Sequence, residues 1–106
     1  MESAYAVHYQ DGTAKVTLAG RLDAANAPGL QEELKKLVGQ KVAKLVFFAK
    51  DLEYISSAGL RVIIFAKQKI GVDAHLYLIA AGETVLSVIK MSGLDNFVTV
   101  QDAWVE

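Results

Sequence analysis

Two adjacent hydroxyl-bearing residues, Ser56 and Ser57, stand where a strand should give way to a helix. Residues 44–48 form an apolar run that is typical of a strand, and residues 60–70 have helical periodicity. A serine is expected at such a boundary, because its oxygen can accept a hydrogen bond from an unpaired backbone N–H of the first helical turn. Capping explains one serine, and the second hydroxyl needs another explanation.

The helix that follows the serines carries mixed chemistry on the side that it shares with Ser57. That side holds Arg61 and Gln68. Two large apolar residues, Ile64 and Phe65, flank them, whereas a surface helix usually carries polar residues there. The opposite side of the helix is expected to face the core, and it carries Gly59, Leu60, Ile63, Ala66 and Ile70. Either the helix is buried more broadly than usual, or the mixed side is a protein-contact surface beside a modifiable hydroxyl.

Phosphorylation of Ser57 would suit that surface as a switch. A phosphoryl group adds about −1.5 to −2 charges, which the N–H groups and dipole of a helix N-terminus tolerate in the free protein. Inside an interface, the same charge must lose its water or meet a like charge. Because a loss of only about 2.7 kcal/mol weakens binding roughly a hundredfold, the complex would dissociate while the fold survives.

The rest of the chain predicts an α/β fold. Alternating residues on both sides of Asp11 and Gly12 predict an initial hairpin, because this pair favours a tight two-residue turn. Further strands are expected at residues 42–48, 74–80 and 97–100, with helices that begin near residues 26, 58 and 82 and end before Gly39, Gly71 and Gly93. The order ββαβαβαβ predicts a mixed, mostly parallel sheet with packed helices. Trp104 in the tail either packs back onto the sheet or serves as a contact residue.

The composition indicates one globular domain over residues 1–106, with 53% hydrophobic and 22% charged residues. A formal net charge of −1 argues against a nucleic-acid binder, since phosphates require a basic surface. The lack of cysteine excludes disulfides and thiolate metal sites. Neither a signal peptide nor an apolar run of the ~20 residues that a membrane span requires is visible. We therefore expect a cytoplasmic protein without membrane insertion.

Three segments of the chain resemble the anti-sigma-factor antagonists, which are single-domain members of the STAS family. Residues 20–23 (Gly-Arg-Leu-Asp) with 26–28 (Asn-Ala-Pro) are similar to the family's second-strand exit and first helix. Residues 51–60 (Asp-Leu-Glu-Tyr-Ile-Ser-Ser-Ala-Gly-Leu) resemble its central signature, and residues 93–97 (Gly-Leu-Asp-Asn-Phe) its last helix-to-strand passage. Together these segments are fairly specific, and the resemblance covers nearly the whole chain.

The resemblance implies bacterial partner switching. The unphosphorylated protein would bind a serine-kinase anti-sigma factor and free the sigma factor, the kinase would phosphorylate the signature serine, and a PP2C-type phosphatase would restore it. The phosphoacceptor position falls on Ser57. Ser56, where the family often has Asp, is the second candidate. Asp23 either contacts the partner or binds N–H groups of its own loop. The expected partner-binding residues are Asp23, Ser56, Ser57, Arg61, Ile64, Phe65 and Gln68.

Other chemistries have weaker support in the sequence. A serine hydrolase needs a base, but the two histidines, His8 and His75, fall in predicted strands and no Gly-x-Ser-x-Gly motif surrounds Ser57. Nothing brings the histidines together as metal ligands, and no phosphate-binding glycine motif occurs. We expect a protein that is not an enzyme and has no cofactor. The alternatives are an unphosphorylated scaffold or adaptor subunit, as in stressosome-like or lipid-transport complexes, and, with less support, a nucleotide-binding variant.

Overall fold

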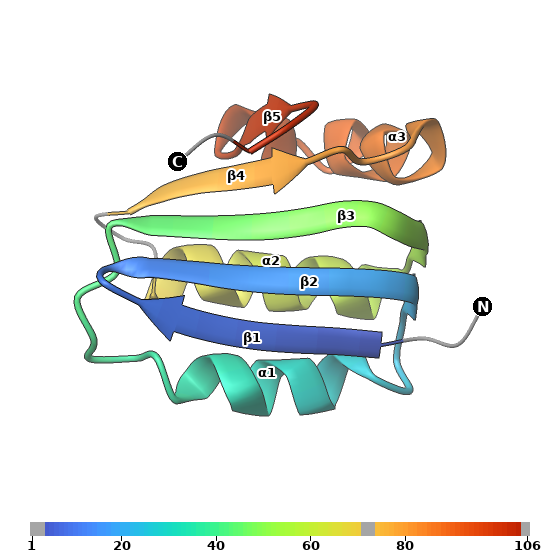
Figure 1. Ribbon diagram of the computed structural model, residues 1–106. Coiled ribbons are helices and arrows are strands. Elements are labelled where there is room, and N and C mark those ends of the chain that lie inside the picture. Colours follow the sequence, from blue (N-terminus) through green and yellow to red (C-terminus); the bar gives the residue numbers. More distant parts are fainter. Residues whose placement is uncertain (1–3, 71–73, 105–106) are drawn as a thin grey trace.

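The computed structural model describes residues 4–70 and 74–104, which form five strands, three α-helices and one short 3-10 helix. In chain order these are β1 (Ala4–Gln10), β2 (Thr13–Leu22), α1 (Ala27–Lys35), β3 (Lys44–Ile55), α2 (Ser57–Lys69), β4 (His75–Ile79), α3 (Glu83–Met91), η1 (Leu94–Asn96) and β5 (Thr99–Gln101). This order confirms the predicted succession of strands and helices. Figure 1 shows the arrangement.

The strands form one mixed sheet in the order β1-β2-β3-β4-β5. β1 and β2 are antiparallel, and every other neighbouring pair is parallel. The predicted hairpin turn is present, because Asp11 and Gly12 have positive φ values of 52° and 82°. Positive φ at both central residues defines the type I′ turn, whose twist matches that of the strands it joins.

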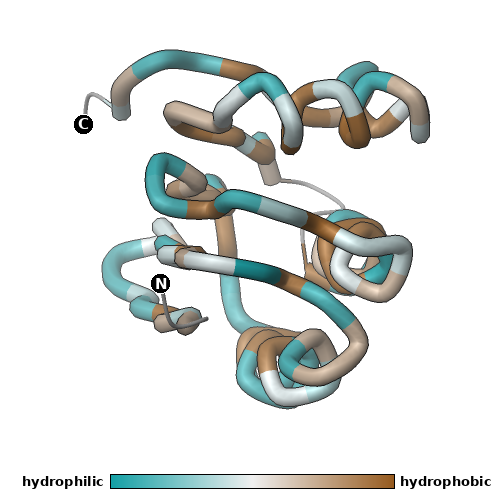
Figure 2. Tube along the Cα trace, turned by 90° about the vertical axis from the view of Figure 1, so that its right-hand side faces the viewer, coloured by the Kyte–Doolittle hydropathy of each residue, from teal (hydrophilic) through white to brown (hydrophobic). Residues whose placement is uncertain are grey.

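All three α-helices lie on the same side of the sheet (Figures 1 and 2). In Figure 1, α2 lies behind β2 and β3, and α1 lies below β1. Between the helices and the sheet lies one core cluster, which includes Val16, Leu18, Leu30, Leu34, Phe47, Ile63, Ala66, Leu78, Val85 and Ile89. Parallel strands joined by helical crossovers produce this layered arrangement.

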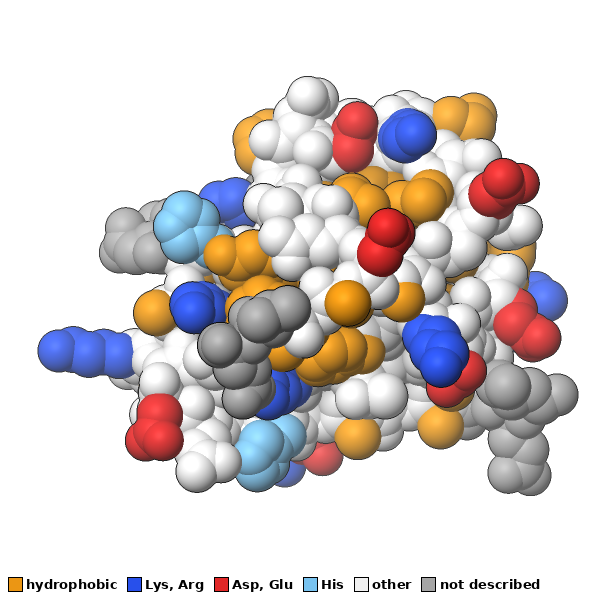
Figure 3. Space-filling view, turned by 45° about the horizontal axis from the view of Figure 1, so that its top comes forward, with side chains coloured by type: hydrophobic (Ala, Val, Ile, Leu, Met, Phe, Trp, Pro, Cys, Tyr) orange, Lys and Arg blue, Asp and Glu red, His pale blue; other side chains and the backbone are white. Residues whose placement is uncertain are grey.

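The other face of the sheet has no helix over it in the described part of the chain (Figure 2). Trp104 packs against this face. Its ring meets the Tyr77 ring edge-on with centroids 4.8 Å apart, and the Lys44 ammonium lies 5.6 Å from its centroid. Of the two roles considered for Trp104, the structure shows packing onto the sheet. Lysine and histidine side chains gather at one end of this face (Figure 3).

The third strand differs most from the sequence-based expectation. It was expected to end at residue 48, but β3 runs on to Ile55. The extension is possible because β2 runs as far as Leu22 and pairs with β3 up to that residue, with two shifts of register on the way. The extension contains exposed charged residues, so it does not continue the apolar run from which the strand was predicted. The serines therefore follow directly on a strand end.

Two helices and the last strand also differ from expectation. Helix α1 ends at Lys35 rather than before Gly39, so Val38 lies in a turn and is 50% exposed. The core side of α2 includes Val62, which was not among the residues expected there, while Leu60 is only partly buried. The last strand is the three-residue β5, because η1 occupies the chain before it.

Candidate functional site

The carboxyl ends of β2 and β3 form the rim on which the candidate site is built. The two strands run parallel, and their last residues, Leu22 and Ile55, are paired. The backbone N–H of Ser56 donates to the carbonyl oxygen of Leu22 at 2.9 Å. Asp23 and Ser56, the residues that follow these strand ends, therefore lie on the same rim.

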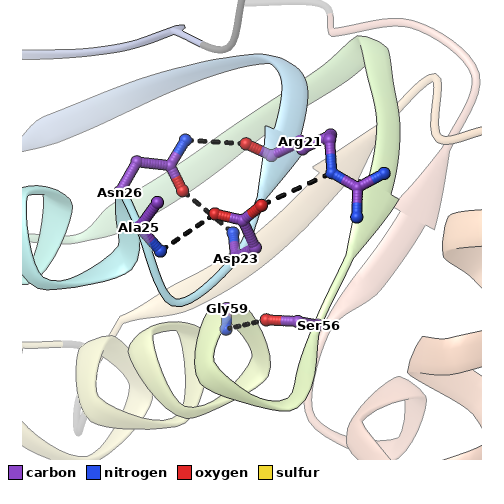
Figure 4. A network of polar contacts seen from close by, with 6 residues as sticks. All are labelled: Arg21, Asp23, Ala25, Asn26, Ser56 and Gly59. Carbon is purple, nitrogen blue, oxygen red and sulfur yellow. Dashed lines mark hydrogen bonds and ion pairs between the residues drawn. The ribbon is translucent and has the colours of Figure 1, made fainter.

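Ser56 caps helix α2. Its backbone is extended, with φ −92° and ψ 176°, and its Oγ accepts a hydrogen bond from the Gly59 N–H at 3.3 Å (Figure 4). This bond satisfies one of the unpaired N–H groups in the first helical turn. The side chain is half-buried. One of the two serines therefore has a complete structural explanation.

Ser57 is the first residue of α2, and its side chain is exposed. Its Oγ accepts a hydrogen bond from Nη2 of Arg61, one helical turn further along, at 3.4 Å. At that length the bond is weak. The Ser57 hydroxyl thus stands on the surface at the amino end of a helix, beside a guanidinium group.

Gly59 brings the first turn of α2 close to the rim. A Cβ at this position would lie 2.7 Å from the carbonyl oxygen of Leu22 and 2.8 Å from Cγ1 of Ile55. Real Cβ atoms do not approach other atoms so closely, so only glycine allows the helix to start against these strand ends. The Ala58-Gly59 pair after the serines therefore has a packing role.

Asp23 belongs to a polar network that holds the loop between β2 and α1 (Figure 4). Its Oδ1 accepts from the Ala25 N–H at 3.0 Å, and its Oδ2 lies 3.4 Å from Nε of Arg21. Asn26 accepts from the Asp23 N–H at 2.9 Å and donates to the Arg21 carbonyl at 2.7 Å. Asp23 thus binds its own loop, as one of its two expected roles requires. Its side chain is still 28% exposed and so accessible to a partner. Partner contact therefore stays a prediction.

Arg21 also joins β3 to this rim. Its guanidinium carbon lies 4.2 Å from the ring centroid of Tyr54, which is close enough for a cation–π interaction. Tyr54 is one of the exposed large aromatic side chains, and it precedes Ser56 by two residues. Neither Arg21 nor Tyr54 was among the expected site residues.

The outer side of α2 continues from the serine toward a groove. Ile64 is 37% exposed and Gln68 is exposed, whereas Phe65 is partly buried and packs against the core. Beside them lies a groove of about 510 Å³ lined by Ile64, Lys67, Gln68, Ser92, Leu94 and Phe97. The structure thus brings Ser57, Arg61, Ile64 and Gln68 onto one side of α2, and it assigns Phe65 partly to the core.

Four residues that line the groove, Lys67, Ser92, Leu94 and Phe97, were not among the expected site residues, and Phe97 is the most exposed apolar one. It was expected inside a strand, but it follows η1 and is 61% exposed. An aromatic residue in a short β-like run normally predicts burial, so its type gave no signal of exposure. Phe97 is exposed because it lies in the turn after η1, at the groove beside α2, and not in a strand of the sheet.

The two histidines lie far from the serines. His75 pairs with Lys44, the first residue of β3, and His8 pairs with Lys15, whose partner in β3 is Val46. The serines follow the last residue of β3, Ile55. In the register of β3 these positions lie nine residues (His8) and eleven residues (His75) before Ile55, so most of the length of the strand separates each histidine from Ser57. Neither can act as a base for its hydroxyl.

Residues 4–70 and 74–104 contain no group of three or more His, Cys, Asp or Glu side chains that could hold a metal ion. None of the helices described is long and apolar enough to cross a membrane.

Comparisons with known proteins agree on one family. Residues 4–105 match the family model described as STAS domain. The chain is 28% identical over 97 residues to the anti-sigma-F factor antagonist RsfB of Mycobacterium tuberculosis, which covers 88% of this chain and 80% of RsfB. It is 38% identical over 84 residues to BtrV of Bordetella bronchiseptica, described as a candidate anti-sigma factor antagonist, which covers 78% of this chain and 72% of BtrV.

Solved structures show the same fold. The crystal structure of an anti-sigma factor antagonist from Mycobacterium paratuberculosis superposes with a TM-score of 0.82 at 24% identity, covering 96% of this chain and 87% of that one. The anti-sigma factor antagonist SpoIIAA in its unphosphorylated form gives a TM-score of 0.77 at 16% identity, covering 95% and 90%. At these identities the likeness concerns the fold alone.

Proposed function

Since the chain belongs to the STAS domain family, we propose that it is an anti-sigma factor antagonist whose partner binding is switched off by phosphorylation of Ser57. In its unphosphorylated form it binds a serine-kinase anti-sigma factor in the cytoplasm, and the sigma factor is released. The kinase phosphorylates Ser57, and a PP2C-type phosphatase removes the phosphate. The relatives named as anti-sigma factor antagonists support the general role.

The different surroundings of the two serines carry the proposal. Ser56 is half-buried and its oxygen caps α2, so a phosphate there would disrupt the helix start. Ser57 is exposed, and its oxygen has only a weak contact with Arg61 in the described bonds. A phosphate on Ser57 leaves the cap of Ser56 intact. Ser57 is therefore the proposed phosphoacceptor, and Ser56 is second.

The electrostatics of this position favour a switch that spares the fold. A phosphate on the first residue of α2 adds about −1.5 to −2 charges next to the helix N-terminus, where negative charge is stabilised. It would also draw the guanidinium of Arg61, which is already in contact with the Ser57 oxygen, into a charge-assisted hydrogen bond. The phosphate thus removes two proposed partner contacts at once, the hydroxyl of Ser57 and the guanidinium of Arg61.

The remaining expected contacts fit a surface for a protein rather than for a small substrate. Ile64, Gln68 and the partly buried Phe65 continue along α2 from Arg61, and Asp23 lies on the rim beside Ser56. A mixture of apolar and arginine side chains is typical of the centre of an interface. No histidine lies near Ser57 to activate it, so we propose that Ser57 receives a phosphoryl group and does not catalyse.

Binding measurements with Ser57 variants test the proposal. Each serine-kinase anti-sigma factor of the host cell is purified and titrated with the wild-type protein, Ser57→Ala and Ser57→Asp by calorimetry. We expect Ser57→Ala to bind one of them constitutively, and Ser57→Asp to bind it about a hundredfold more weakly, which is about 2.7 kcal/mol. Both variants should melt like the wild type. Equal affinities for the two variants would contradict the switch.

A scaffold role without phosphorylation predicts a different result. In that case the anti-sigma factors would not distinguish Ser57→Asp from the wild type, and the purified kinase with ATP would leave the protein unmodified. The same titration carried out with GTP and ATP alone tests the nucleotide-binding alternative.

A further inference from the structure

We propose that the groove beside α2, lined by Ile64, Lys67, Gln68, Ser92, Leu94 and Phe97, is an anchor for the anti-sigma factor that does not respond to phosphorylation. Its occupant is an acidic segment of the anti-sigma factor that carries a large apolar side chain. This inference rests on the proposed function, and it divides the partner surface into a switch at Ser57 and an anchor at the groove.

The groove has the shape and chemistry of a docking site for an apolar side chain. Its volume is about 510 Å³. Leu94 is buried, while Phe97 and Ile64 are 61% and 37% exposed. Large apolar side chains that line a concave surface next to water are typical of a binding surface, because covering them releases water.

The groove is continuous with the proposed switch surface. Ile64 and Gln68 line the groove, and they also belong to the side of α2 that carries Ser57 and Arg61. Ile64 follows Ser57 by seven residues, which corresponds to about 10 Å along a helix. A partner that covers the Ser57 hydroxyl and extends along α2 therefore reaches the groove.

The charges around the groove define the occupant. Near the groove, helix α2 carries Arg61 and Lys67 and has no acidic residue, while its third cation, Lys69, lines a different pocket. Lys67 lines the groove itself, and Lys90 lies in the last turn of α3. Asp95 of η1, next to the groove-lining Leu94, is acidic and offsets part of this charge. The excess of positive charge favours an acidic partner segment and disfavours a second copy of this chain, whose α2 is equally basic.

Distance separates the anchor from the switch electrostatically. Charges at a protein surface are largely screened beyond a Debye length, which is about 8 Å at physiological ionic strength. Lys67, the charged residue that lines the groove, follows Ser57 by ten residues, which corresponds to about 15 Å along the helix. A phosphate on Ser57 therefore repels the partner mainly at the switch and weakens the attraction at the groove much less, so the phosphorylated protein retains weak affinity.

A double-mutant cycle with the anti-sigma factor tests this inference. Calorimetry would compare the wild type, Phe97→Ala, Ile64→Ala, Ser57→Asp and the double variant Ser57→Asp/Phe97→Ala. Val38→Ala is the matched control, because Val38 is also an exposed aliphatic residue but does not line the groove. We expect Phe97→Ala and Ile64→Ala to weaken binding about tenfold or more, with Val38→Ala within about twofold. The effects of Ser57→Asp and Phe97→Ala should multiply.

The possible results separate this inference from the proposed function. If Ser57→Asp loses affinity while Phe97→Ala and Ile64→Ala bind like the wild type, the switch stands and the anchor is wrong. If the wild type binds none of the anti-sigma factors, both are wrong. Sedimentation of the protein alone is the second measurement. A dimer that Phe97→Ala dissociates and Val38→Ala preserves would assign the groove to a second copy, and would overturn the anchor.

Discussion

The inner and outer sides of the first turn of α2 differ in role: the inner side stabilises the fold, and the outer side carries the proposed switch. On the inner side, Ser56 caps the helix and Gly59 allows it to start against Leu22 and Ile55. On the outer side, Ser57 and Arg61 contact each other at the surface. Adjacent residues in the sequence thus serve the fold and the proposed switch separately. Such a division allows the switch residue to change its charge while the helix start is preserved.

The largest effect of breaking this division is expected at Gly59. In Gly59→Ala, the new Cβ would lie 2.7 Å from the backbone oxygen of Leu22, so the helix or the strand end must shift. Overpacking of this kind costs about 1–3 kcal/mol, which exceeds the helix propensity that alanine gains over glycine, up to about 1 kcal/mol. We expect a clear fall in melting temperature, measured by circular dichroism.

Ala58→Gly provides the matched control for that change. It removes a half-buried methyl group from the neighbouring position of the same helical turn, so it costs helix propensity, about 1 kcal/mol or less, and part of the packing of that methyl group, but creates no close contact. Should Gly59→Ala prove as stable as the wild type, the close approach of α2 to the rim is not a constraint on the sequence.

An intermediate effect is expected from the two serines compared directly. Ser56→Ala removes the cap of α2 and should lower the free energy of unfolding by about 1 kcal/mol. Ser57→Ala removes an exposed hydroxyl with a weak contact, and should change it by less than about 0.5 kcal/mol. Urea denaturation of the two variants measures the difference. Equal losses of stability would show that the inner and outer roles are not divided between the serines.

The smallest effect concerns Arg61 and the phosphate. In protein prepared with phosphoserine at position 57, Arg61→Gln should raise the second pKa of the phosphate, because a neighbouring cation favours the doubly charged form. An exposed pair of this spacing contributes about 0.3–0.5 kcal/mol, so the rise should be roughly 0.3, since one pKa unit corresponds to about 1.36 kcal/mol. Phosphorus NMR titration measures it.

The control for that titration is Gln68→Ala, which lies on the same side of α2 and carries no charge. It should leave the phosphate pKa as in the parent phosphoprotein. A phosphate pKa that is identical in the Arg61→Gln variant and in its parent would remove Arg61 from the switch.

The sequence predicted the fold because the local signals agree with the final packing. The turn at Asp11 and Gly12, the apolar start of β3 and the helix after the serines are each specified by neighbouring residues. The full length of β3 was not predictable in this way. In its last part, buried apolar residues are interspersed with exposed residues, several of them charged. These residues are held in the sheet by pairing with β2, which lies far away along the chain.

The part of the candidate site at the start of α2 and along its outer side was predictable from the sequence. The boundary between β3 and α2 marked Ser56 and Ser57, and helical spacing placed Arg61, Ile64 and Gln68 on the side of Ser57. Helical spacing could not reveal that Phe65 packs partly against the core. Nor could it reveal the groove, because Phe97 reaches α2 only through the folding of η1.

A phosphosite map of the protein isolated from its own cells tests the central claim most directly. Intact mass and peptide fragmentation would be recorded with and without PP2C-type phosphatase treatment. The account predicts a single phosphoryl group on Ser57 that the phosphatase removes. A phosphate on Ser56, or a protein that is unmodified in every growth condition in which the kinase is active, would contradict it.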